Sequence, residues 1–395
     1  MSAVKVVHMT SAHPALDLRI FQKECRSLAR AGLDVTMIGP YAEDETVDQV
    51  HIKAIPIETD RLRRMTLNVW RVYREACRSD ADLYHFHDFE LIAVGLALRA
   101  KGKKVIYDIH EDMPRGVLSK HYLPGWTRPA LAKIVASVEE FAARRFSALV
   151  PVTPSIAERF IPLNEKTVIV HNYPFSQTKP AGTETIRWEK RDMSVVYVGG
   201  VTAQRGIREM VEAISLVPAS LNAALEIAGN EVPEHCRPQE LQRHPGWKRV
   251  HHRGVLNQAG VAELLDRVRA GLVIFLPKPN HIEAMPQKLF EYMKAGIPVI
   301  ASDFPLWRKI LEEAGSGILV DPTTPAAIAA AIEYVLTHPK EAEAMGRAGR
   351  TAVARHYTWE TQGAKLVRLY RDLLDGVPGE SAGLSGSQAS LPLPS

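Results

Sequence analysis

Short runs rich in β-branched residues alternate with longer amphipathic runs along this chain, and the alternation occurs in two successive blocks. This pattern is typical of parallel sheets covered by helices, because each strand needs a crossover segment that returns the chain to the same edge of the sheet. The chain has 395 residues, which is enough for two domains with separate cores. The sequence therefore predicts an α/β protein made of two doubly wound domains.

The first block contains seven strand-like runs, at residues 4–10, 35–40, 52–57, 82–87, 104–110, 148–153 and 167–172. Its helical runs cover residues 18–31, 62–77, 91–100, 129–146 and 154–160. Gly32 follows one of these helical runs and Gly102 another, as expected of a glycine just after a helix C-terminus.

The second block repeats the pattern, with strands expected at residues 194–198, 223–228, 250–255, 271–276, 298–302 and 317–321. Helices are expected at residues 207–216, 258–268, 286–295, 306–314, 325–337, 340–356 and 359–374. We expect domains at residues 1–174 and 193–357, joined by a linker over 175–192 that has no apolar period. A C-terminal helix is expected over 358–375, and residues 376–395, rich in Ser, Gly and Pro, are expected to be disordered.

Composition excludes several classes of protein. A net charge of +4 over this length is too small for a dedicated nucleic-acid binder. The three cysteines, Cys25, Cys77 and Cys236, lie far apart, which argues against a disulfide framework and a thiolate zinc site. No signal peptide and no run of 18 apolar residues is visible, so we expect a cytoplasmic protein.

Residues 279–300 carry the strongest functional signal. They leave an apolar strand, cross a polar loop and enter a helix that starts near Pro286. The amides of Gln287 and Lys288 then lack intrahelical acceptors and face the strand end, where an anion is favoured. Glu283 before the helix and Glu291 inside it can bind sugar hydroxyls. Each residue alone fits a capped surface helix with a salt bridge, but the whole set favours a ligand site.

A second element, residues 195–206, runs from a strand through Gly199 and Gly200 to Arg205. Glycines let a backbone approach phosphate closely, and a guanidinium can bind it through two donors. The spacing matches neither the dinucleotide fingerprint nor the Walker loop.

The 279–300 segment resembles the E-x7-E region of the retaining glycosyltransferases of sequence family 4, which have two Rossmann-like domains facing across a cleft, the GT-B fold. The resemblance extends over nearly the whole chain except the tail. It implies that Glu283 binds hydroxyls of the transferred sugar, that Glu291 binds the nucleotide ribose, and that the C-terminal helix crosses back to the first domain. Gly200 stands where a basic residue is usual, which leaves Arg205 and Lys288 for the diphosphate.

The resemblance implies a retaining, metal-independent hexosyltransferase that uses a nucleotide diphosphate sugar, with uridine the first choice of base and guanosine the second. The acceptor is expected to be a glycan or a lipid-linked glycan, and no further cofactor is expected. The expected catalytic residues are His110, Glu283 and Glu291. The expected donor-binding residues are Gly199, Gly200, Arg205, Met285, Pro286, Gln287, Lys288 and Leu289. The expected acceptor-binding residues are His13, Asp17 and Arg19, although Asp17 equally fits the N-cap of the first helix.

Two other functions stay open. His85, His87 and Asp88, with His110, Glu111 and Asp112 at the end of the next strand, could hold a divalent metal and make the protein a metal-dependent hydrolase. A nucleotide-sugar epimerase would use the same fold without an acceptor.

Residues 61–78 contain six arginines and one acid, on a helix whose expected core-facing residues are Leu62, Met65, Val69, Tyr73 and Ala76. Further basic residues at Arg99, Lys101, Lys103 and Lys104, and the apolar loop 122–126, lie in the same half of the chain. A solvated helix face explains such charge. Attachment to an anionic membrane surface also explains it, and we keep peripheral attachment at the inner face of the membrane as a hypothesis.

Overall fold

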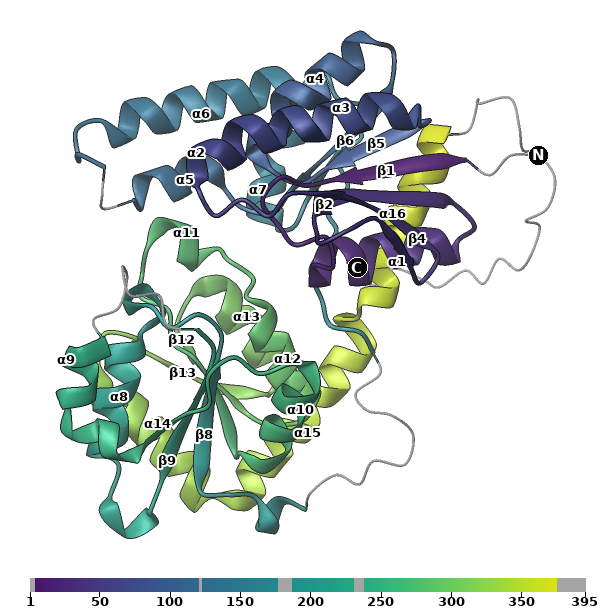
Figure 1. The fold of residues 1–395 in the computed structure, drawn as a ribbon. Coiled ribbons are helices and arrows are strands. Elements are labelled where there is room, and N and C mark those ends of the chain that lie inside the picture. The colour runs from purple at the N-terminus through teal and green to yellow at the C-terminus, as the bar shows by residue number, and fades with distance from the viewer. Residues whose placement is uncertain (1–3, 121–122, 177–186, 231–237, 375–395) are drawn as a thin grey trace.

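The structure, a computed structural model, describes residues 4–120, 123–176, 187–230 and 238–374. These residues form two domains, each built on one sheet with helices on both faces (Figure 1). The first sheet has the strand order β3-β4-β2-β1-β5-β6-β7 and is parallel except for β3, and the second has the order β10-β9-β8-β11-β12-β13 and is wholly parallel. The predicted fold class is confirmed.

The strands of the first sheet are β1 (Lys5–Met9), β2 (Asp34–Pro40), β3 (Glu45–Val47), β4 (Val50–Ile55), β5 (Leu83–Phe86), β6 (Lys104–Ile109) and β7 (Ala148–Pro151). The helices of this domain are η1 (Leu18–Cys25), α1 (Arg26–Arg30), α2 (Arg61–Arg63), η2 (Arg64–Asn68), α3 (Val69–Ser79), η3 (Phe89–Leu91), α4 (Ile92–Ala100), α5 (Met113–Leu118), α6 (Arg128–Ala143) and α7 (Pro154–Phe160).

The strands of the second sheet are β8 (Ser194–Val198), β9 (Ala224–Ala228), β10 (Val250–His252), β11 (Ala270–Val273), β12 (Val299–Ser302) and β13 (Gly317–Val320). The helices around it are η4 (Trp188–Lys190), η5 (Ala203–Arg205), α8 (Ile207–Leu216), η6 (Ala219–Leu221), α9 (Pro238–Arg243), η7 (Pro245–Arg249), α10 (Gln258–Arg267), α11 (Pro279–Ile282), α12 (Gln287–Ala295), α13 (Pro305–Ala314), α14 (Pro325–Thr337) and α15 (Pro339–His356).

The last helix, α16 (Trp359–Leu374), leaves the second domain and packs against η1 and α1 of the first (Figure 1). The Trp359 indole N–H donates to Ser27 Oγ at 2.9 Å, and the Trp359 amide donates to the carbonyl of Pro174. Tyr370, fully buried, reaches the sheet of the first domain. Because the core on this face includes both α16 and β1, the end of the chain is part of the first domain's interior.

Several sequence-based expectations were wrong in detail. Residues 167–172 are not assigned as a strand, although Thr167 forms an isolated bridge with Leu149 and the amides of Val168 and Val170 donate to carbonyls of β7. The helices α5 and α11 were not expected, because each is short and α5 contains Gly116, which lowers helix propensity. Most of the expected linker, the whole expected disordered tail and Cys236 lie outside the described residues.

The expected core-facing stripe of residues 61–78 was also wrong at its N-terminal end. Leu62 is 71% exposed and Met65 is 41% exposed, whereas Val72 and Ala76 are buried. The chain enters the sheet layer only from Asn68 onward, so the first turn and a half projects beyond the sheet. Within the described residues, no helix is both long enough and apolar enough to cross a membrane.

Candidate active site

The N-terminus of α12 presents a buried cation. Pro286 precedes α12 in an extended conformation, so the amides of Gln287 and Lys288 open the helix without intrahelical acceptors. The Lys288 ammonium lies 3.9 Å from the centre of the Tyr197 ring and has no hydrogen-bond partner among the described residues. Burial, followed by the nearby charge of Arg205, holds the pKa of Lys288 well below its usual value.

The turn after β8 completes this positively charged site. Gly199 has φ of 135°, and a Cβ placed there would lie 2.7 Å from Lys288 Nζ. A Cβ on Gly200 would lie 3.3 Å from the Arg205 guanidinium, so the two glycines leave space beside both cations. Glycine backbone, two cations and free helix amides together suit a phosphate or diphosphate.

A cavity of about 420 Å³ lies between the two domains and includes Glu291. It is lined from the second domain by α10 and α12, and from the first domain by residues including Leu18 and Lys23. Burial raises the pKa of Glu291, and burial lowers the pKa of Lys23 to about 7. Both domains thus contribute an ionisable group to one shared, partly open cavity.

Glu283 lies at the C-terminal end of α11 and forms an ion pair with Arg115 of α5, which belongs to the first domain. Ser119 also donates to Asn280 Oδ1 at 2.9 Å, so α5 and α11 contact each other across the cleft. The loop after Glu283 is held in place by the Trp307 indole, which donates to the carbonyl of Ala284 at 2.6 Å.

The expected first-domain residues do not all reach the cleft. The rings of His13 and His110 lie 5.6 Å apart, and both side chains are partly exposed. Asp17 caps η1 by accepting from the amides of Arg19 and Ile20. Arg19 is only 4% exposed, and it holds Asp108 through two nitrogens. Arg19 therefore positions Asp108 and is not available to an acceptor, which corrects the expectation.

Three of the expected donor-binding residues, Met285, Pro286 and Leu289, differ in how far they are open to a ligand. Met285 is partly buried against the core of that domain, and Pro286 caps α12. Leu289 is fully buried in the core, and its amide donates to the carbonyl of Pro286 at 3.1 Å. Leu289 offers neither a side chain nor a free amide to a ligand, so its assignment to donor binding was wrong.

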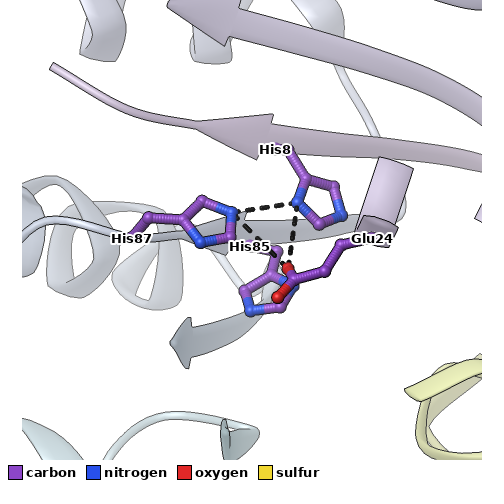
Figure 2. Close-up of side chains that lie close together, drawn as sticks. All are labelled: His8, Glu24, His85 and His87. Carbon is purple, nitrogen blue, oxygen red and sulfur yellow. Dashed lines mark hydrogen bonds and ion pairs between the residues drawn. The ribbon is translucent and has the colours of Figure 1, made fainter. Parts of the chain in front are cut away.

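A separate polar cluster lies inside the first domain and consists of His8, Glu24, His85 and His87 (Figure 2). His85 and His87 share one face of β5, as the sequence predicted, with ring centres 4.8 Å apart. Asp88 does not join them, because its carboxylate accepts from Thr10 Oγ1 and from the amide of Ser11.

One neighbouring acid of the expected metal-dependent hydrolase, Asp112, is also engaged elsewhere. The carboxylate of Asp112 caps α5 and pairs with Arg159. His85 is fully buried and His87 is 4% exposed, so a substrate in the cleft cannot reach them. Among the described residues, His85, His87 and Asp88 therefore do not form a metal centre that opens into the cleft.

Sequence reasoning missed Arg115, Lys23 and Glu24. Arg115 was missed because α5 was not expected, although Asp112 followed by Pro114 is a helix-start signal. Lys23 and Glu24 lie in a predicted helix, and a charged residue in the apolar stripe of such a helix was the available signal.

Two family models match this chain. The model described as Glycosyl transferases group 1 matches residues 183–352, and the model described as Glycosyltransferase Family 4 matches residues 20–173. The two matches follow the division into two domains and together take up most of the chain.

Individual relatives agree with the family models. A glycogen synthase from Mycobacterium tuberculosis is 24% identical over 73% of this chain and 68% of its own length. The solved sucrose-phosphate synthase from Thermosynechococcus elongatus has a TM-score of 0.75 at 19% identity, over 94% of this chain and 99% of the other. HepE from Anabaena, solved with UDP and glucose, has a TM-score of 0.70 at 13% identity, over 93% of this chain and 100% of the other. The chain therefore belongs to the glycosyltransferases and has the GT-B fold.

Proposed function

We propose that this protein transfers a hexose from a UDP-sugar to a glycan or lipid-linked glycan acceptor, with retention of the anomeric configuration. The observation that carries the donor proposal is the buried Lys288 ammonium beside Arg205 and the first amides of α12. A diphosphate would supply the counter-charge that these groups lack, and in a closed cleft the same groups would stabilise the leaving nucleotide. We propose that transfer needs no metal, because these groups provide the positive charge.

The choice of uridine rests on similarity of fold to HepE, which was solved with UDP. In this arrangement, Glu291 in the interdomain cavity binds the ribose. The sugar lies toward Glu283, where its hydroxyls replace Arg115 as the partner of the carboxylate. Retention follows the resemblance of the Glu283 and Glu291 spacing to the E-x7-E region.

The acceptor belongs on the first-domain side of the cleft, beside His13 and His110. His110 pairs with Asp108 at 3.4 Å, and Arg19 holds that carboxylate from behind. This chain of contacts orients the His110 ring toward the reacting sugar. Asp17 contributes by fixing the start of η1.

An epimerase would use the same donor site without an acceptor, and product analysis separates the two functions. Incubation of the protein with UDP-glucose alone would give a second UDP-hexose from an epimerase. A transferase would leave UDP-glucose intact or release UDP slowly until an acceptor is added.

We also propose that the first domain rests on an anionic membrane surface through α2, η2 and α6. The exposed apolar residues on these helices are Leu62, Met65, Leu67, Leu131, Ile134, Val138 and Phe141. Basic residues flank them, including Arg63, Lys133, Arg144 and Arg145. An apolar face bordered by cations fits the interface of an anionic lipid layer. α3, which continues η2, and α6 both pack against α4, so α3, α4 and α6 belong to one layer (Figure 1).

Replacing Lys288 by methionine should stabilise the unliganded protein and weaken UDP binding. At neutral pH, folding of the wild type must bury an ammonium or remove its proton, a cost that methionine does not carry. The lost contact to phosphate should raise the Kd for UDP about 10- to 100-fold. Calorimetry and thermal unfolding measure both effects, with the exposed Lys309→Met as control. Unchanged UDP affinity would remove Lys288 from the donor site.

Glu283→Gln should reduce kcat/KM about 100-fold, because the donor sugar loses an orienting carboxylate. The Arg115–Glu283 pair is 37% and 42% exposed, so the free energy of unfolding should change by less than about 1 kcal/mol. Glu312→Gln removes a comparably exposed partner of Arg308 and serves as the control. Full turnover in Glu283→Gln would contradict the assigned role.

The double variant Ile134→Ser, Phe141→Ser should lower affinity for vesicles containing anionic lipid about tenfold or more. These side chains are 60% and 52% exposed, so the fold should tolerate serine at both sites. Val255→Ser, at a 74% exposed site of the second domain, is the matched control. Wild-type protein that stays unbound at low salt in a vesicle co-sedimentation assay would contradict the proposal.

A further inference from the structure

The cluster of His8, Glu24, His85 and His87 brings together four side chains from separate parts of the first domain (Figure 2). His8 is in β1, Glu24 is in η1, and His85 and His87 are in or directly after β5. His8 and His85 are register partners on adjacent parallel strands, and Glu24 faces them from the helix that covers this part of the sheet. One potential ligand atom from each residue lies within 4.8 Å of all the others.

The inner atoms of this cluster, by which we mean the one nitrogen or oxygen of each side chain that faces the other three, have few hydrogen-bond partners. His8 Nδ1 and His87 Nε2 are 3.0 Å apart, a contact that one shared proton can serve. Glu24 Oε2 lies 3.9 Å from His8 Nδ1 and 4.0 Å from His87 Nε2, distances too long for hydrogen bonds. Neither Glu24 Oε2 nor His85 Nε2 has a hydrogen-bond partner among the described residues, although both are buried. Such groups are costly to bury unless something binds them.

The outer atoms, meaning the second ring nitrogen of each histidine and the other oxygen of Glu24, each have a polar partner. The Tyr370 hydroxyl of α16 lies 2.9 Å from His8 Nε2 and 2.8 Å from His85 Nδ1. His87 Nδ1 lies 3.2 Å from His110 Nε2 and 3.4 Å from Asp108 Oδ2. Glu24 Oε1 pairs with Arg19 Nε at 3.0 Å. Ligand histidines in metal sites characteristically have the second ring nitrogen fixed in this way.

We propose that His8 Nδ1, Glu24 Oε2, His85 Nε2 and His87 Nε2 bind a zinc ion. Three imidazoles and one carboxylate form a four-coordinate nitrogen and oxygen set that suits zinc. Bonds of about 2.0–2.1 Å require neighbouring ligand atoms about 3.3 Å apart, close to the separations of 3.0 to 4.0 Å found for three pairs of these atoms.

The overlapping trio of His87, Asp108 and His110 is a weaker candidate. Its carboxylate is already bound by Arg19 through two nitrogens, and His110 is partly exposed. In the four-residue cluster, Arg19 pairs with the outer oxygen of Glu24 and leaves Oε2 for the ion.

The proposed ion is structural. The three ligands His8, Glu24 and His85 are 0% exposed, and all four coordination positions are taken by protein atoms, so no position is left for a substrate. Through Tyr370, the site would join β1 and β5 to α16, the helix that links the two domains. This role is independent of the metal-free transfer proposed above.

The test uses the tag-free chain expressed in zinc-supplemented medium, with bound metal measured by inductively coupled plasma mass spectrometry. We expect one zinc ion per chain. Because the cluster is sealed, metal exchange is tested by unfolding in guanidinium with chelator and refolding with Zn²⁺ or Mg²⁺. Zinc should restore the melting temperature and magnesium should not. Refolding with Co²⁺ should give the visible absorption of four-coordinate cobalt.

Two variants connect any bound zinc to this cluster. Glu24→Gln keeps the size of the side chain and should weaken zinc binding about tenfold or more, and Tyr370→Phe should weaken it by a similar factor through loss of the outer contact. His51→Gln, on an exposed histidine of β4, should bind zinc as the wild type does. The proposal is overturned if the wild-type chain holds no zinc and refolds equally well in Mg²⁺. It is also overturned if Glu24→Gln retains zinc with wild-type affinity, since the ion then lies elsewhere.

Discussion

The positive charge at the start of α12 is the constraint on which the donor site depends. Lys288 places an amino group beside Arg205 in a buried space, where it has no hydrogen-bond partner among the described residues and burial and Arg205 outweigh the attraction of Glu291. A protein that kept such a group only for stability would gain by losing it. The arrangement is understandable if a diphosphate occupies the space during the reaction, because the anion then restores the charge balance.

The rest of the second domain supports this charge. The ring of Tyr197 in β8 lies beside the Lys288 ammonium. The Tyr292 hydroxyl of α12 accepts from the amide of Val198, which fixes the position of the helix relative to the strand. Gly271 allows the close approach, since a Cβ there would lie 2.1 Å from the Tyr292 ring. The same helix carries Glu291 into the interdomain cavity. The position and charge of the site therefore come from the packing of α12 on β8 and β11.

Patterns among residues close together in the sequence were sufficient to predict most helices and strands and the donor half of the site. β8, α8 and α14 have the predicted bounds, because a clear strand or helix period ends at a proline, a glycine or a polar turn. Glu283, Lys288 and Glu291 could be found because they lie close together in sequence around one helix start.

What could not be predicted depends on contacts between distant segments. Arg115 meets Glu283 only through the packing of α5 on α11. His8 meets His85 through the register of β1 with β5, and Glu24 reaches both only because η1 packs over this part of the sheet. Arg19 is buried because its guanidinium pairs with the buried Asp108. Leu62 and Met65 were assigned to the core because helical periodicity shows an apolar face but not whether the sheet extends beneath it.

The most direct test of the donor site is thermal unfolding of the wild-type chain with UDP, GDP, ADP and dTDP, each with and without EDTA. A ligand that binds only the folded state raises the melting temperature. We predict that UDP gives the largest increase and that the increase is the same in EDTA, because protein cations and amides hold the diphosphate. An increase that disappears in EDTA, or no increase with any nucleoside diphosphate, would contradict the account.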